Sequence, residues 1–193
     1  MEFEAARAFI LDKLNKELPQ HLSYHSVLHV QDVYNSVGII SEQEGVSGED
    51  LTLLLTAALF HDSGFLIQQK DHEMISCDIV REYLPGYNYT PAQIEQICGM
   101  IMATKIPQQP HNLLEEILAD ADLDYLGRDD FFIIGDRLFS ELSMYGMISN
   151  ERDWNLLQIK FLEGHKYFTK TAISMRKAQK EKYLQLIKLK VDL

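Results

Sequence analysis

The chain has 193 residues, which is enough for one domain with a sizeable hydrophobic core. Its net charge of −11 disfavours duplex nucleic acid as a partner, and its two cysteines are too few for a disulfide scaffold. The acidic start is unlike a signal peptide, and the longest apolar run is far shorter than the roughly 20 residues that span a bilayer. We therefore expect a soluble cytoplasmic protein with no membrane partner.

Apolar residues recur with helical spacing along almost the whole chain and predict about eight to nine helices. The predicted helices cover residues 2–17, 24–43, 51–60, 70–84, 91–103, 113–122 and 128–145, a segment opening at Asn150, and 164–188. Capping signals support several starts, at Ser47-x-x-Asp50, Thr90-Pro91 and Asn112-x-x-Glu115. The prediction is an all-α protein, with residues 1–193 in one domain on which the helices of 150–193 pack.

The pair His61-Asp62 stands where the apolar helix 51–60 ends. Two ionisable groups at this position are unusual, because burying an unpaired charge costs several kcal/mol. A bound divalent cation would remove that cost. Gly64 follows closely, and we expect it to let the chain turn away from the ligands.

Three further clusters contain histidines or carboxylates. His25 and His29 are four residues apart, so one helix would place both on the same face. His72 precedes a predicted helix, and the acidic triplet of 120–124 closes another, where the helix dipole favours cations. Any one of these histidines by itself is more often a satisfied core residue, so the prediction of a metal site depends on the whole set.

The ordered set resembles the HD-domain metal-dependent phosphohydrolases. The matching segments are Tyr24-His25-x-x-x-His29, Ala58–Gly64 and Ala119–Gly127, so the resemblance covers about residues 20–130. It implies that one divalent ion is held by His29, His61, Asp62 and Asp122. Spacing alone leaves Asp120, Asp122 and Asp124 equivalent; the match to the family's Ala-Asp-Leu selects Asp122.

The resemblance also implies roles for neighbouring residues. His25 falls where the cyclic-nucleotide phosphodiesterase branch has a histidine that protonates the leaving oxygen; a residue that orients a ligand is the alternative. His72 matches a ligand of a second ion in two-metal members, but no histidine stands near Thr104, where the next such ligand belongs. Asp62 or Asp120 could accept a proton, and Asp120 could also orient a ligand.

The family implies hydrolysis of a nucleotide or other small phosphate ester through a metal-activated water, with Mn²⁺, Fe²⁺, Zn²⁺, Co²⁺ or Mg²⁺ as the ion. The segment Asp62–Phe65 lacks the features of three branches: the lysine of cyclic-di-nucleotide phosphodiesterases, the Glu-Asp pair of alarmone hydrolases, and the Gly-His pair of deoxynucleotide triphosphohydrolases. This segment therefore does not identify a substrate. The alternatives are a regulatory metal- or nucleotide-binding module without turnover and a di-iron oxygenase.

Basic residues outside these motifs are candidates for contact with a substrate phosphate. Lys105 follows a predicted helix, and His165 and Lys166 begin the basic helix of 164–188. The alternative for Lys105 is a cation at a helix C-terminus, and for the other two a solvated surface.

Overall fold

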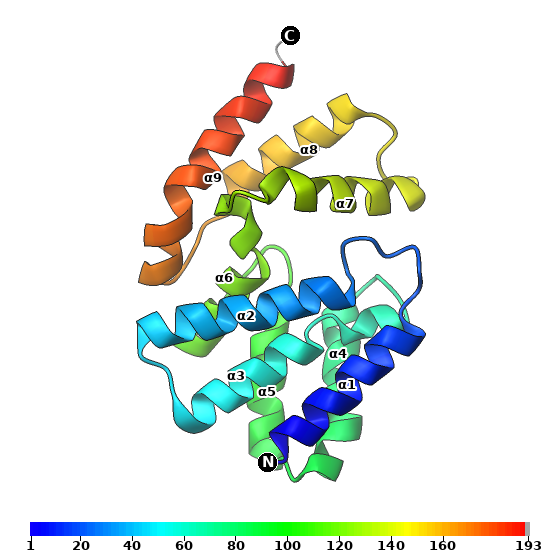
Figure 1. Cartoon of the computed structure of the whole chain (residues 1–193), viewed down its shortest axis with the longest axis vertical. Helices are drawn as coiled ribbons and strands as arrows, with labels where there is room; N and C mark the ends of the chain where they lie inside the picture. The colour runs from blue at the N-terminus through cyan, green and yellow to red at the C-terminus, as the bar shows by residue number, and fades with distance from the viewer. Residues whose placement is uncertain (192–193) are drawn as a thin grey trace.

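The computed structural model describes residues 1–191, and within them all regular structure is helical (Figure 1). The α-helices are α1 (Phe3–Glu17), α2 (Val27–Glu44), α3 (Gly48–Phe60), α4 (His72–Tyr83), α5 (Pro91–Ala103), α6 (Leu113–Asp122), α7 (Phe131–Met144), α8 (Glu151–Gly164) and α9 (Lys170–Val191). Short 3₁₀ helices are η1 (Ser63–Leu66), η2 (Leu84–Tyr87) and η3 (Asp124–Gly127). The predicted all-α class and helix number are confirmed. Across the described part of the chain, no helix has the length and apolar character needed to cross a membrane.

Side-chain caps fix three of the predicted helix starts. Thr90 and Gln93 form a reciprocal capping box at α5, while Asn112 and Asn150 each accept a backbone N–H three residues on. Ser47 occupies the cap position of α3 but makes no side-chain cap bond there. Each cap satisfies backbone donors that the first turn of a helix leaves unpaired, so it determines where the helix begins.

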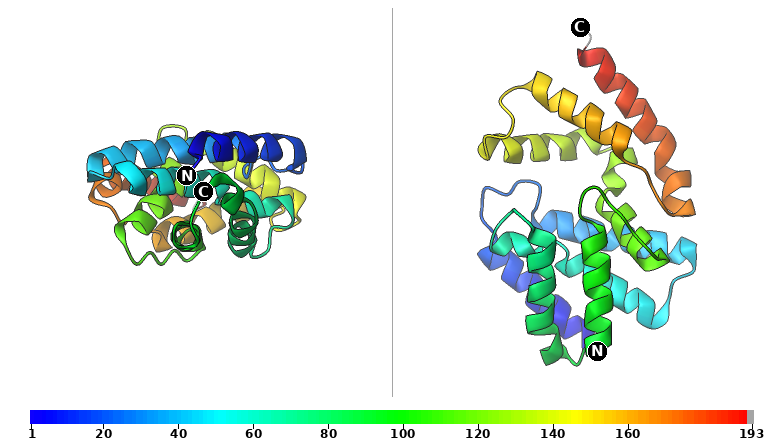
Figure 2. Two further views of the ribbon diagram at one scale, coloured as in Figure 1. Left: turned by 90° about the horizontal axis from the view of Figure 1, so that it is seen from below. Right: turned by 180° about the vertical axis from the view of Figure 1, so that it is seen from behind.

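Residues from all six helices α1 through α6 form one large hydrophobic cluster. Helices α2 and α3 pack against each other, and α4 and α5 form a second pair beside them (Figures 1 and 2). The most deeply buried side chains in this cluster include Ile10, Leu14, Ile40, Leu54, Phe60, Leu84, Ile97 and Ile101. Because α2, α3 and α6 share this core, the ends of these helices are held rigidly relative to one another.

A second hydrophobic cluster joins η3 to α7, α8 and α9. These three helices lie together at the C-terminal end of the molecule (Figure 1). The Arg176 side chain on α9 forms a two-point ion pair with Asp124, at 2.6 and 3.0 Å. Gly127 allows close packing there, because a Cβ at this position would lie 2.4 Å from the Arg176 carbonyl oxygen. The pairing ties α9 to the segment that follows α6.

Helix α9 begins at Lys170, six residues later than predicted. Residues 165–169 instead form a loop that hydrogen-bonds to Asp120, which is fully buried. The Asp120 carboxylate accepts the backbone N–H of Phe168 and both the N–H and hydroxyl of Thr169, at 2.7–3.2 Å. The sequence pattern missed this loop because its stabilising partner lies 48 residues away.

Asp120→Ala is expected to lower the free energy of unfolding by about 3 kcal/mol, because several buried donors would lose their acceptor. Urea unfolding measures this change. Glu116→Ala, one turn earlier on α6, is the control and should change stability by no more than about 0.5 kcal/mol. Equal stability of the Asp120 variant and the wild type would contradict the assigned role.

Candidate metal centre

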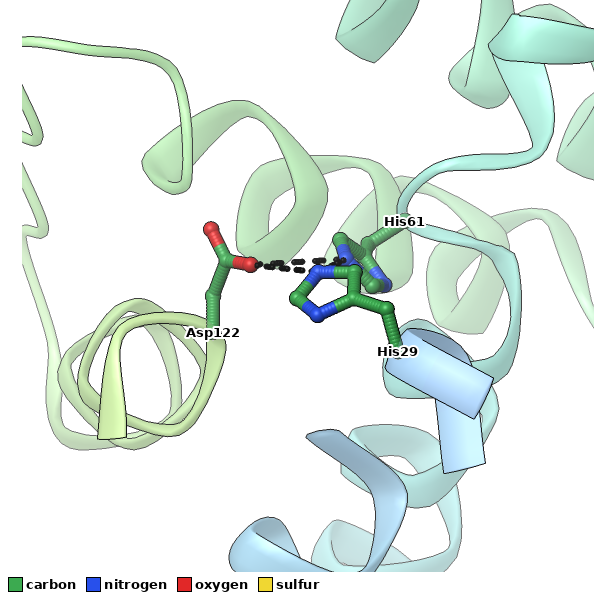
Figure 3. A group of neighbouring side chains, drawn as sticks. All are labelled: His29, His61 and Asp122. Atoms are coloured by element: carbon green, nitrogen blue, oxygen red, sulfur yellow. Dashed lines mark hydrogen bonds and ion pairs between the residues drawn. The ribbon is translucent and has the colours of Figure 1, made fainter. Parts of the chain in front are cut away.

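Three separate elements bring their side chains to one point. His29 comes from the first turn of α2, His61 follows α3, and Asp122 ends α6. His29 Nε2 lies 3.1 Å from Asp122 Oδ1 and 3.4 Å from His61 Nε2, and His61 Nε2 lies 3.5 Å from the same Asp122 oxygen. Figure 3 shows the two rings and the carboxylate facing one another. These three residues could hold a metal ion.

Asp62 adds a fourth group to this cluster. Its Oδ2 lies 3.2 Å from His61 Nε2 and 3.4 Å from His29 Nε2. The atom is buried, yet it accepts no well-oriented hydrogen bond from any of residues 1–191. A buried carboxylate oxygen without a donor is costly, and a cation would satisfy it.

The hydrogen bonding of His61 determines which of its ring nitrogens faces the cluster. Its Nδ1 lies 2.8 Å from the Ala58 carbonyl oxygen, which can only accept, so Nδ1 carries the proton. In the neutral ring, Nε2 then presents a lone pair toward His29 and the carboxylates. His29, His61 and Asp122 could together hold one ion with mixed imidazole and carboxylate ligands, and Asp62 lies within 3.4 Å of both imidazoles.

The ionisable groups of the cluster shift the pKa values of one another. Burial lowers the pKa of His61, but Asp62 and Asp122 outweigh this effect and raise the pKa well above 6.5. Burial raises the pKa of Asp122, but hydrogen bonds with His29 and His61 bring it down to about 2. Near neutral pH, the metal-free protein therefore holds a proton on His61 between two carboxylates.

Metal affinity is consequently expected to rise with pH, by up to about tenfold per pH unit, because the His61 proton must leave before Nε2 can coordinate. The same proton stabilises the metal-free fold below the unfolded pKa of about 6.5, and this stabilisation is lost as pH rises through the higher folded value. Calorimetric titration with Mn²⁺ in buffers of different ionisation enthalpy measures the released proton. Affinity that stays constant from about pH 6 to 8 would contradict the linkage.

Gly64 serves the site through close packing rather than through a special backbone conformation. Its φ is not positive, so the expectation that it provides a turn by conformational freedom was wrong. A Cβ at Gly64 would lie 2.1 Å from the His72 carbonyl oxygen. Its N–H donates to Ser76 Oγ at 2.8 Å, and that hydroxyl donates to the His61 carbonyl at 2.6 Å. The first turns of α4 are thus joined directly to the ligand segment.

His25 lies beside the cluster, but not on the same helix as His29. Helix α2 begins at Val27, so the predicted start at residue 24 was wrong. Glu141 on α7 holds the backbone N–H groups of Tyr24 and His25 outside the helix, at 2.8 and 3.1 Å. Sequence reasoning did not identify Glu141, because nothing near it in the chain marks it as part of a site.

His72 lies on the other side of Asp62. Its Nε2 is 3.4 Å from Asp62 Oδ1 and 3.6 Å from Glu73 Oε1. Asp62 therefore faces the main cluster with one oxygen and His72 with the other. Thr104 lies in the same cavity wall and donates its hydroxyl to the Ile101 carbonyl.

The remaining predicted residues lie outside this cluster. Asp120 points to the loop before α9, where burial raises its pKa to about 6. Lys105 is exposed and pairs with Asp71 at 2.9 Å. His165 Nδ1 lies 3.3 Å from Nζ of the buried Lys180. His165 and Lys166 also line a second hollow. The structure thus brings none of these four basic or acidic groups to the candidate ligands.

A cavity of about 490 Å³ opens beside the candidate ligands. One end is polar and is lined by His25, Asp62, His72, Glu73 and Asp122. The rest is mainly apolar and is walled by α7 and α8, with Phe131, Leu138, Leu142, Trp154, Leu157 and Phe161. The cavity therefore joins a charged centre to a chamber suited to an apolar or aromatic group.

The all-α architecture of the described residues is one that solved structures of other proteins share. No family model matches the sequence, and no curated protein matches it either. Solved structures do match the fold. A predicted HD superfamily hydrolase from an uncultured Thermotogales bacterium is 18% identical over 96% of this chain and 91% of its own, with a TM-score of 0.64.

Two further structures share the fold over nearly their whole lengths. A Lactobacillus plantarum protein is 18% identical over 98% of each chain, with a TM-score of 0.67. YpgQ of Bacillus subtilis, solved in complex with ADP, is 19% identical over 97% of each chain, with a TM-score of 0.65. These similarities confirm the predicted fold, which is shared with a protein described as a predicted HD superfamily hydrolase.

Proposed function

We propose that this protein is a metal-dependent phosphohydrolase whose substrate is a nucleotide or a similar phosphate ester. The observation that carries the proposal is the convergence of His29, His61, Asp62 and Asp122, of which Asp62 and Asp122 line the polar end of the cavity. We assign these four residues as ligands of one divalent ion. When bound, the ion supplies Lewis acidity, which activates water near neutral pH and polarises a phosphoryl oxygen.

Side chains of the protein would accept and donate the protons in this reaction. In hydrolysis, a water oxygen bonds to phosphorus while the bond from phosphorus to the leaving oxygen breaks. Asp62 lines the cavity and would accept a proton from water, whereas Asp120 is occupied by other donors. His25 lines the same cavity and would donate a proton to the leaving oxygen. Such acid–base help contributes about 10²–10⁴-fold.

The apolar chamber supports a substrate with a large organic group. A free phosphate or a small alkyl ester would leave most of the 490 Å³ unfilled. An aromatic base would bury its surface against Trp154 and Phe161, and Gln158 could hydrogen-bond to its edge. The similarly folded YpgQ was solved in complex with ADP, which also favours a nucleotide.

Phe161→Ala is expected to raise KM for nucleotides about tenfold, because stacking of a base on an aromatic ring is worth about 1–3 kcal/mol. The KM for a small alkyl phosphate should stay constant, since that substrate does not reach the chamber. Steady-state kinetics with both substrates measure the difference. Leu156→Ala on the same helix, at a position outside the cavity wall, is the matched control.

The direct test of the function is elemental analysis of the purified protein followed by a hydrolysis screen with the metal found. The screen covers nucleoside mono-, di- and triphosphates, cyclic nucleotides and simple phosphate esters. We expect turnover that a chelator removes and the metal restores. Bound metal with no turnover on any substrate would overturn the proposal and favour a binding module.

A further inference from the structure

Glu141 is a buried carboxylate at the boundary between the C-terminal helices and the candidate centre. It lies near the end of α7, and its side chain is 0% exposed. Burial raises its pKa, but His25 and the backbone N–H groups outweigh this effect, so the net pKa is lowered and the group is ionised near neutral pH. A buried charge of this kind requires partners.

All the partners of this carboxylate belong to the segment that carries His25. Glu141 Oε2 accepts the backbone N–H of Tyr24 at 2.8 Å and that of His25 at 3.1 Å. Glu141 Oε1 accepts a hydrogen bond from His25 Nδ1. One side chain thereby determines both the backbone and the ring position of His25. The Ser23 hydroxyl, which donates to the Arg137 carbonyl at 2.7 Å, further attaches this segment to α7.

The His25 ring is also held on its faces. It stacks on Phe65 with ring centroids 4.0 Å apart and planes 20° apart, and Tyr24 meets it edge-on at 4.7 Å. Because an ionised carboxylate can only accept, Nδ1 carries a proton and donates it to Glu141. Nε2 is the nitrogen left to meet a substrate in the cavity.

We propose that Glu141 is the positioning residue for proton donation by His25, and that helix α7 is therefore part of the catalytic machinery. This inference rests on the function proposed above. The Glu141 carboxylate holds Nδ1–H and stabilises the charged imidazolium, and Nε2–H passes its proton to the leaving alkoxide as that oxygen separates from phosphorus. The ring is left neutral with Nδ1–H still bonded to Glu141, and Nε2 regains a proton from solvent.

The test compares two leaving groups in wild type and Glu141→Gln. An alkoxide needs a proton on departure, whereas p-nitrophenolate is stable without one. In Glu141→Gln the amide NH₂ can donate to Nδ1, which removes the charge pairing and favours the wrong tautomer. We expect kcat with the alkoxide substrate to fall about 10²-fold or more, with kcat for the aryl ester within a few-fold of wild type.

Four further variants make the result specific. Glu141→Asp keeps the carboxylate and should recover part of the lost alkoxide rate. Glu141→Gln combined with His25→Gln should be no slower than His25→Gln alone. The two residues act together in proton donation, so the loss of either one removes the same contribution. Glu163→Gln on the exposed surface of α8 is the matched control and should leave both rates unchanged. Equal loss on both substrates in Glu141→Gln would show a purely structural role and overturn the proposal.

A measurement that does not depend on turnover tests the role of Glu141 separately from the proposed hydrolase function. Nitrogen-15 NMR of the imidazoles reports which ring nitrogen is protonated. We expect His25 Nδ1 to be protonated in the wild type and to lose that state in Glu141→Gln. An unchanged His25 signal in the variant would overturn the positioning role even in an active enzyme. Wild-type protein inactive on every ester, with the NMR change present, would overturn the hydrolase function but retain the Glu141–His25 pairing.

Discussion

Replacing Asp122 with alanine is expected to abolish retention of the metal and to lower turnover by about three orders of magnitude. Asp122 Oδ1 lies within 3.5 Å of both imidazole Nε2 atoms, so its loss removes the carboxylate that completes the proposed ligand set around the two histidines. Lewis-acid stabilisation of a phosphoryl transition state is worth several kcal/mol, and each 1.36 kcal/mol is tenfold in rate. Elemental analysis and turnover with added Mn²⁺ measure the two effects.

Asp124→Asn is the matched control for this variant, because it changes a carboxylate two residues away. Asp124 pairs with Arg176 and not with the histidines. Its substitution should lower thermal stability but leave the metal content of the folded protein unchanged. Metal retained at the wild-type level in Asp122→Ala, or lost equally in Asp124→Asn, would contradict the assignment of the ligand.

Gly64→Ala is expected to lower the free energy of unfolding by about 3 kcal/mol, at the upper end of the usual cost of overpacking. The added Cβ would stand 2.1 Å from the carbonyl oxygen and 2.8 Å from the Cα of His72. These are backbone atoms, so relief requires the start of α4 to move away from Asp62. A displacement of about 1 Å at a reacting group costs about 10²-fold in rate, which we expect in addition to the loss of stability.

Gly38→Ala provides the comparison, since a Cβ there meets no atom within 4 Å and the residue is inside α2. Alanine in a helix interior is favoured over glycine by about 0.8–1 kcal/mol, so this variant should become more stable. Chemical denaturation and turnover distinguish the two glycines. A Gly64 variant with wild-type stability and rate would show that α4 can shift at no cost.

The helices were predictable because their signals are local. Apolar spacing and caps such as Thr90 with Gln93 depend on residues within one or two turns, and these elements appear within a few residues of the predicted bounds. The errors occur where a distant side chain competes with the local pattern. Asp120 holds residues 168–169 out of α9, and Glu141 holds residues 24–25 out of α2.

The candidate ligands were predictable in part. An apolar helix ending in His61-Asp62 already indicates a bound cation, because the charges would otherwise be buried without partners. Spacing could not distinguish Asp122 from its acidic neighbours. The structure separates the three by their partners: Asp120 meets backbone donors, Asp124 meets Arg176, and Asp122 meets the two imidazoles.

The sequence by itself determined the all-α class, the approximate helices and a set of ionisable groups that predicts a bound cation, since helical period and uncompensated charge are properties of short segments. Only the tertiary structure decided which groups meet. The convergence of α2, α3 and α6, the close contact of Gly64 with His72, and the reach of Glu141 to His25 all depend on packing between segments far apart in the chain. Such contacts have no local signature, because they arise from the shared core and not from neighbouring residues.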